Sequence, residues 1–131
     1  MITVDARRSL LLDAAHNVAS IAAFSSYVSE VWPGGLPIVF AALRDKDVDG
    51  MAHALGSAAT QLVCAPLASP RALPPEELAV RLRRARPDLE ITVAASARQA
   101  LDVAWKGGDI VGAAGSVFLV GELAECLALR A

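Results

Sequence analysis

Short apolar runs alternate with helix-type apolar spacing along the whole chain. Five short runs are mainly apolar and do not alternate with polar residues, which is typical of strands buried on both faces of a sheet. These predicted strands comprise residues 9–12, 37–40, 61–64, 91–93 and 109–111. Because predicted helices separate them, the pattern indicates an α/β fold. We expect one Rossmann-like, doubly wound domain over residues 1–131, with a mostly parallel sheet of about five or six strands and helices on both faces.

Capping residues set the expected helix ends. Asn17 is a candidate N-cap for the first helix, which the Pro-Gly-Gly run at 33–35 ends. Either Asp45 or Asp47 opens the second helix. The inner faces expected of the first and last helices are apolar, with Glu122 and Glu125 turned outward: Ile21, Phe24, Val28 and Val31 for the first, and Val120, Leu123, Ala124 and Leu127 for the last.

The composition supports a folded domain and gives no basis for binding nucleic acid. Of the 131 residues, 55% are hydrophobic, which excludes the apolar-poor balance of a disordered chain. Twelve Lys and Arg against fourteen Asp and Glu give a net charge of -2, so no basic surface for nucleic acid is predicted. One basic cluster falls at the end of a predicted helix, where we interpret it as a solvated surface that complements the helix dipole: Arg81, Arg83, Arg84 and Arg86.

The sequence predicts neither membrane insertion nor a disulfide framework. The longest stretch without charged residues, 50–70, contains polar residues such as His53 that a lipid-spanning helix would not readily tolerate. His53 falls off the apolar stripe of its helix, so we expect it at the surface. The two cysteines, Cys64 and Cys126, have no metal-ligand spacing, and we expect both in the core of a cytoplasmic protein.

Polar residues gather in the loops that follow the predicted strands, where ligands bind in a doubly wound sheet. Asp13 and His16 directly follow the first strand and precede a helix N-terminus, so they can reach a ribose hydroxyl and a phosphate together. The alternative that Asp13 or Asn17 only caps the helix while His16 packs locally stays open. The chain has neither G-x-G-x-x-G nor G-x-x-x-x-G-K-[ST], so any contact with nucleotide phosphates is expected without a phosphate loop of its own.

Four segments carry the polar residues of these loops: L-D-A-A-H-N at 12–17, A-L-R-D-K-D at 42–47, S-P-R-A-L at 69–73 and G-S-V-F-L-V-G-E at 115–122. They resemble, in the same order, the motifs L-D-G-A-H-N-P, A-L-x-D-K-D, S-P-R-A-L and G-S-L-Y-L-V-G-E. Those motifs belong to the C-terminal domain of the Mur ligase superfamily, in its folylpolyglutamate synthase and dihydrofolate synthase branch. The resemblance covers nearly the whole chain, and four collinear matches make it specific.

The resemblance implies a function that needs more than this chain. Enzymes of this family use ATP and magnesium to convert the carboxylate of a pteroate or folate, such as dihydropteroate, into an acyl phosphate. The amino group of glutamate then attacks the acyl phosphate to form an amide. The family's own N-terminal ATPase domain supplies the phosphate loop and the magnesium ligands, while the C-terminal domain closes over ATP and glutamate. By this analogy the chain alone is expected to be inactive and to hold no metal.

The resemblance also implies roles for individual residues. Asp13 and Asn17 are expected to bind ATP, and His16 is expected to act as the catalytic residue near the terminal phosphate or the acyl phosphate. For residues 45–47, a helix cap with a local ion pair stays open as the alternative. The expected contacts to the amino-acid substrate are Arg71, Ser69, Ser116 and Lys46.

Three departures from the family pattern leave alternatives open. Ala14 replaces the glycine and Val18 the proline of the first motif, and the family's P-G-R segment would fall at or before Met1. We therefore expect a domain cut from a larger enzyme, with Met1 as a truncation point. The alternatives are a non-catalytic Rossmann-like binding or interaction module with a decayed site, and a related Mur-type ligase with another substrate.

Overall fold

The sheet is built mainly from parallel strands, as the apolar runs predict. The computed structural model describes residues 1–128. Five strands run parallel: β2 (Ser9–Leu12), β3 (Leu36–Phe40), β4 (Ala59–Cys64), β5 (Glu90–Val93) and β6 (Ile110–Ala114). A short strand, β1 (Ile2–Thr3), pairs antiparallel with β2, and the order across the sheet is β1-β2-β6-β3-β4-β5. The predicted fold class is therefore confirmed.

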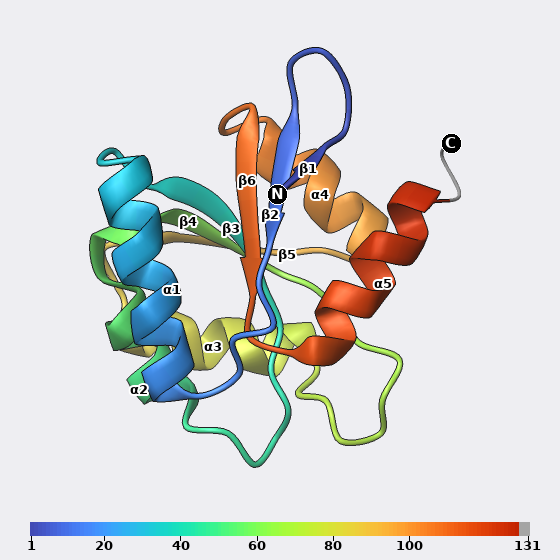
Figure 1. The fold of residues 1–131 in the computed structure, drawn as a ribbon. Coiled ribbons are helices and arrows are strands. Elements are labelled where there is room, and N and C mark those ends of the chain that lie inside the picture. The colour runs from blue at the N-terminus through green and yellow to red at the C-terminus, as the bar shows by residue number, and fades with distance from the viewer. Residues whose placement is uncertain (129–131) are drawn as a thin grey trace.

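Helices cover both faces of this sheet (Figure 1). On one face lie α1 (Val18–Val31), α2 (Val48–Leu55) and α3 (Pro75–Ala85), with a 3-10 turn (Gly56–Ala58) after α2; on the other lie α4 (Ala97–Trp105) and α5 (Val117–Ala128). Each face has its own cluster of buried apolar side chains, because each sheet face must be covered separately. Among residues 1–128, no helix has the length and apolar character that a lipid bilayer crossing requires.

Local patterns located most of these elements, but they missed β1, ended the last strand at Val111 although β6 continues to Ala114, and misplaced part of α5. β1 has only two residues and both are exposed, so it leaves no apolar run to detect. In α5 the buried residues are Leu119 and Leu123, and Ala124 is exposed, contrary to the expected face. Glu122 was expected outward, yet it is half-buried and its Oε1 accepts a hydrogen bond of 3.1 Å from the backbone N–H of Ala68. The covered stripe thus starts one residue earlier than the spacing suggested.

Two further side chains depart from their predicted places. Val31 ends α1 at 46% exposure rather than on its inner face, because the helix runs past the edge of the core. Arg86 is not a solvated helix-end cation: its side chain is only 12% exposed. Its guanidinium donates hydrogen bonds of 3.0 Å to the backbone carbonyls of Ala52 and Gly56, which satisfies carbonyls at the end of α2.

Candidate functional site

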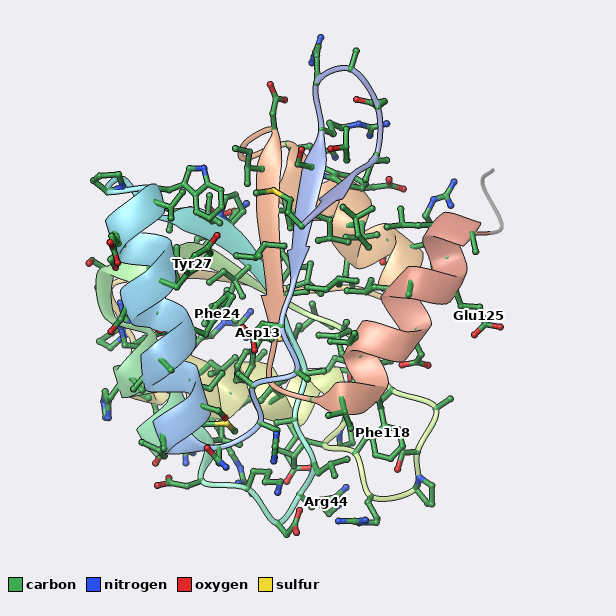
Figure 2. All side chains as sticks on the ribbon, in the orientation of Figure 1. Asp13, Phe24, Tyr27, Arg44, Phe118 and Glu125 are labelled. Atoms are coloured by element: carbon green, nitrogen blue, oxygen red, sulfur yellow. The ribbon has the colours of Figure 1, made fainter. Side chains whose placement is uncertain are left out.

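The four segments that carry the sequence motifs meet at the carboxyl end of the sheet. Two backbone hydrogen bonds join the third segment to the second, from Arg44 N–H to the Arg71 carbonyl at 2.8 Å and from Leu73 N–H to the Ala42 carbonyl at 3.0 Å. A third, from Gly115 N–H to the Ala15 carbonyl at 2.7 Å, joins the fourth segment to the first. Figure 2 shows Arg44, from the second segment, and Phe118, from the fourth, both in the lower part of the molecule.

Gly115 makes this convergence possible. Its φ of +111° lies in a region that L side chains rarely adopt. A Cβ at this position would also collide with the carbonyl oxygen of Ala41, the residue that follows β3. Only glycine therefore lets the turn after β6 pass so close to the end of β3.

A small pocket of about 170 Å³ opens where these segments meet. Three of the residues predicted from the sequence line it, and they come from three different loops: His16, Lys46 and Ser116. Its remaining lining residues are Leu43, Gly115 and Val117. The pocket thus places an imidazole, an ammonium group and the start of a helix around one cavity with apolar walls.

The imidazole of His16 has a defined orientation. Its Nδ1 lies 3.0 Å from the carbonyl oxygen of Ala14, and a carbonyl can only accept, so Nδ1 carries the proton in this contact. Its Nε2 has no hydrogen-bond partner among residues 1–128. Nε2 is therefore the ring nitrogen that remains for a ligand in the pocket.

Asp13 and Asn17 lie beside the pocket rather than in its lining. One oxygen of the half-buried Asp13 carboxylate accepts a hydrogen bond of 2.8 Å from Ala15 N–H, which leaves Oδ2 without a partner in the described part of the chain. Asn17 is the N-cap of α1, and its Oδ1 accepts bonds of 2.8 Å from both the backbone N–H and the hydroxyl of Ser20. The side-chain oxygen of Asn17 is thus committed to capping, and only its amide N–H₂ group is available to a ligand.

The other predicted substrate contacts divide into two groups. Lys46 is half-buried at the pocket, and its ammonium group has no ion-pair partner within residues 1–128. Ser116 is buried, and its hydroxyl oxygen accepts a bond of 3.1 Å from Phe118 N–H at the start of α5. Arg71 and Ser69 do not line the pocket. Arg71 is exposed and forms an ion pair of 3.6 Å with Asp45.

Other polar and reactive side chains considered from the sequence do not line the pocket. Asp47, not Asp45, is the N-cap of α2, where its carboxylate accepts a bond of 2.9 Å from Gly50 N–H. Cys64 is fully buried, and burial raises the pKa of its thiol to about 12, so it is not a nucleophile. Cys126 is only half-buried, in contrast to the core position expected for it. His53 is exposed, as predicted.

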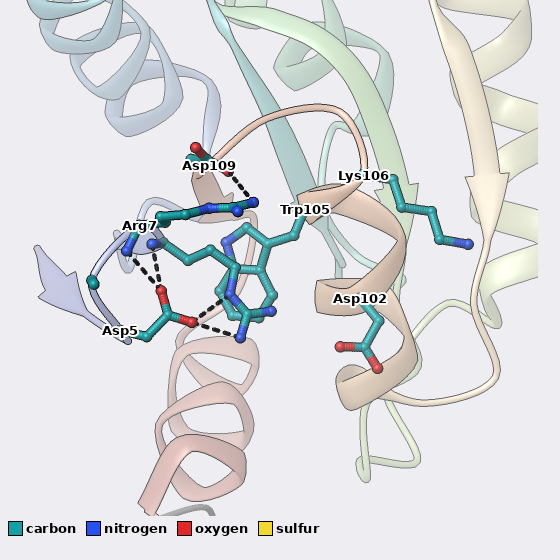
Figure 3. Close-up of a pocket in the computed structure, with 8 residues that line it drawn as sticks. Asp5, Arg7, Asp102, Trp105, Lys106 and Asp109 are labelled. Atoms are coloured by element: carbon teal, nitrogen blue, oxygen red, sulfur yellow. Dashed lines mark hydrogen bonds and ion pairs between the residues drawn. The ribbon is translucent and has the colours of Figure 1, made fainter.

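A second hollow, of about 550 Å³, lies at the opposite end of the sheet (Figure 3). Here the guanidinium of Arg8 stacks 4.6 Å from the centre of the Trp105 ring, and Asp5 pairs with Arg8 at 2.8 Å. Arg7 approaches Asp109 at 3.9 Å. These contacts hold the β1–β2 loop against the end of α4, and the cations and carboxylates of the lining are balanced in number.

Chemistry-based sequence reasoning did not find Leu43, Gly115 and Val117, because none of them has a reactive side chain. Their positions within the second and fourth segments, close to Lys46 and Ser116, are the sequence feature that could have identified them as pocket residues. For a metal ion, residues 1–128 offer no group of three His, Cys, Asp or Glu side chains close enough to hold one.

Comparisons with known proteins agree with this architecture. The family described as "Mur ligase, glutamate ligase domain" matches residues 1–117. Folylpolyglutamate synthase of Mycobacterium tuberculosis, complexed with ADP and AMPPCP, is similar at 28% identity and a TM-score of 0.87, over 95% of this chain and 30% of that chain. E. coli FolC in complex with DHPP and ADP is similar at 25% identity and a TM-score of 0.77, over 92% of this chain and 29% of that one.

A third solved structure is the bifunctional folylpolyglutamate synthase/dihydrofolate synthase of Yersinia pestis, complexed with AMPPNP and a Mn ion. It has 26% identity and a TM-score of 0.76, over 93% of this chain and 28% of that chain. The chain therefore spans about a third of the length of the solved structures it matches. Comparison with curated proteins finds no match.

Proposed function

Because the chain belongs to the Mur ligase glutamate ligase domain family, we propose that it is the C-terminal domain of an ATP-dependent ligase. The proposed enzyme joins glutamate through an amide bond to the carboxylate of a pteroate or folate. Its own N-terminal ATPase domain would complete the active site, so the isolated chain is inactive. The observation that carries the proposal is the pocket that brings His16, Lys46 and Ser116 together at the carboxyl end of the sheet.

The residues of the pocket suit a reaction in which negative charge develops on phosphate oxygens. Bound ATP supplies the phosphoryl group that activates the acid as an acyl phosphate. The Nε2 of His16 would contact that group, and the ammonium of Lys46 would balance its charge or bind a carboxylate of glutamate. Leu43 and Val117 form apolar walls beside the two polar groups.

ATP fits the residues around the first segment. The free Oδ2 of Asp13 can accept a hydrogen bond from a ribose hydroxyl, and the N-terminus of α1 favours phosphate oxygens nearby. We propose Asp13 and the side-chain amide of Asn17 as ATP contacts on this basis. Magnesium would be held by residues outside this chain, because the described residues provide no cluster of ligands.

The departures from the family motif do not argue for a decayed site. Within residues 1–128, positive φ angles occur only at glycines, so Ala14 has an ordinary backbone conformation and needs no glycine. Its carbonyl even holds the His16 ring through the 3.0 Å contact to Nδ1. The enzyme is therefore favoured over a non-catalytic module that keeps only the fold.

The first test is kinetic and uses the longer protein encoded by the parent reading frame, which is expected to contain a Gly-Lys-Ser or Gly-Lys-Thr phosphate loop upstream. His16→Ala and Asp13→Ala should each lower glutamate-dependent ATP turnover at least tenfold, about 1.4 kcal/mol of transition-state stabilisation. His53→Ala is the matched control, because His53 is the second of the two histidines and lies in α2, outside the pocket. Equal turnover in all three variants would contradict the proposal.

The second test separates amino-acid binding from nucleotide binding. Arg71→Met should raise the KM for glutamate more than the KM for ATP, because the motif resemblance assigns its guanidinium to a glutamate carboxylate. The reverse pattern would assign Arg71 to the nucleotide. Lys46→Met should do the same as Arg71→Met if its ammonium binds glutamate, and should raise the KM for ATP more if it balances the phosphate charge. Calorimetric titration of ATP into the isolated chain should show weak binding or none, since half a site lacks most charge-assisted contacts.

A further inference from the structure

Ser20 forms the centre of a hydrogen-bond network that holds His16 and Asn17. Its hydroxyl oxygen accepts bonds from His16 N–H at 3.0 Å and from Asn17 N–H at 3.1 Å. The same hydroxyl donates to Asn17 Oδ1 at 2.8 Å, and Asn17 Oδ1 also accepts from Ser20 N–H at 2.8 Å. A hydroxyl has one hydrogen and two lone pairs, so the capacity of the Ser20 side chain is fully used.

The network fixes the backbone on which the His16 ring sits. The Nδ1 of the ring reaches back to the Ala14 carbonyl only while residues 14–17 keep their present path. Asn17, the residue that turns this path into α1, has φ −143° and ψ 174°, an extended conformation. Holding Asn17 extended is therefore what keeps the ring in place, with Nδ1 on the Ala14 carbonyl and Nε2 left free of partners among residues 1–128.

Position 18 is where the resembled motif has proline, and the local geometry would accept one. A proline forces the residue before it into the extended region, which is the conformation that Asn17 has. Val18 is the first residue of α1, where an N–H has no partner within the helix and proline is well tolerated. With valine at 18, the backbone restriction that a proline would impose is absent, and the hydroxyl of Ser20 holds the same conformation by hydrogen bonds.

We infer that Ser20 is a positioning residue for His16 and that its hydroxyl holds Asn17 in the extended conformation, as a proline at position 18 would. The Ser20 hydroxyl and a proline at position 18 are interchangeable for the orientation of the ring. Only the hydroxyl protects the amides of His16 and Asn17 from hydrogen exchange. The catalytic role of His16 rests on the proposed function. Its positioning is measured on the chain itself and needs no activity assay.

The test is NMR spectroscopy of the isotopically labelled chain near pH 8, where a histidine is neutral. Imidazole ¹⁵N shifts report which nitrogen of His16 carries the proton, and amide exchange reports the contacts at His16 and Asn17. Ser20→Ala should lower the share of the Nδ1–H form at least twofold and speed exchange of both amides at least tenfold. In the double variant Ser20→Ala, Val18→Pro, the Nδ1–H share should return while the amides stay fast.

Ser26→Ala is the matched control, because Ser26 is an exposed serine of α1 whose side chain makes no hydrogen bond to the described residues. It should match the unmodified chain in both measurements. An unchanged Nδ1–H share in Ser20→Ala would overturn the inference, and so would a double variant that does not recover it. If Ser20→Ala does not fold, a folded double variant supports the inference and an unfolded one overturns it. Because no turnover enters this test, its failure is distinguishable from failure of the proposed function.

Discussion

Gly115→Ala tests whether the turn after β6 depends on glycine. The added Cβ would collide with the Ala41 carbonyl at a φ of +111°. Backbone strain of this kind costs of the order of 1–3 kcal/mol, and moving the crowded backbone apart adds about 1–3 kcal/mol. We expect a loss of about 4 kcal/mol in the free energy of unfolding. For a urea m-value of about 2 kcal/mol per molar, the midpoint falls by about 2 M.

Urea unfolding followed by circular dichroism measures this change, and Gly121→Ala provides the matched control. Gly121 lies within α5, has no heavy atom within 4 Å of the position its Cβ would take, and is not among the glycines with positive φ. Because alanine favours a helix, Gly121→Ala should gain about 0.5–1 kcal/mol. A loss below about 1 kcal/mol in Gly115→Ala would refute the reasoning, since the strain alone accounts for that much.

Three more predictions address single side chains. Arg86→Met should lower the free energy of unfolding by about 2 kcal/mol, because two helix-end carbonyls lose charged donors. The matched change at an exposed residue, Arg84→Met, should alter it by less than about 0.5 kcal/mol. Equal losses in the two variants would contradict a stabilising role for the Arg86 hydrogen bonds. The pKa of Asp5 is held near 2 instead of 3.8 by hydrogen bonds from Arg7 and Arg8. Its contribution to stability is therefore present above pH 3.8 and is lost as the pH falls through about 2, and a carboxyl midpoint near 3.8 by NMR would contradict this. Iodoacetamide should alkylate the half-buried Cys126 first and should reach Cys64 only after unfolding. The reason is that burial raises the pKa of the Cys64 thiol to about 12. Labelling of Cys64 before unfolding would contradict this prediction.

Local signals predicted the elements that depend on neighbours in sequence. The apolar run at Ser9–Leu12 is β2 to the residue, and Asn17 and Asp47 are N-caps as their side chains indicate. These features follow from contacts within a few residues, which the spacing of apolar and capping residues reports directly. The motif resemblance likewise identified the family, which the match over residues 1–117 confirms.

Contacts between distant segments were not predictable in the same way. Arg86 looked like a helix-end cation, and only the packing of α3 on α2 shows that it reaches the carbonyls of Ala52 and Gly56. Arg71 had the best chemistry for binding a carboxylate, yet it lies outside the pocket in an ion pair with Asp45. A sequence gives residue types, but distances between loops depend on which strands pair.

The sequence by itself determined the α/β class, the order of the elements, the caps and the four segments that hold the candidate site residues, because each is specified by residues close along the chain. The tertiary structure decided which of those residues share one pocket. β6 lies between β2 and β3 although it is the last strand along the chain, and this crossover brings Ser116 beside His16 and Lys46. Such neighbours arise from long-range strand pairing and from the close approach that Gly115 allows, neither of which leaves a periodic signal in the sequence.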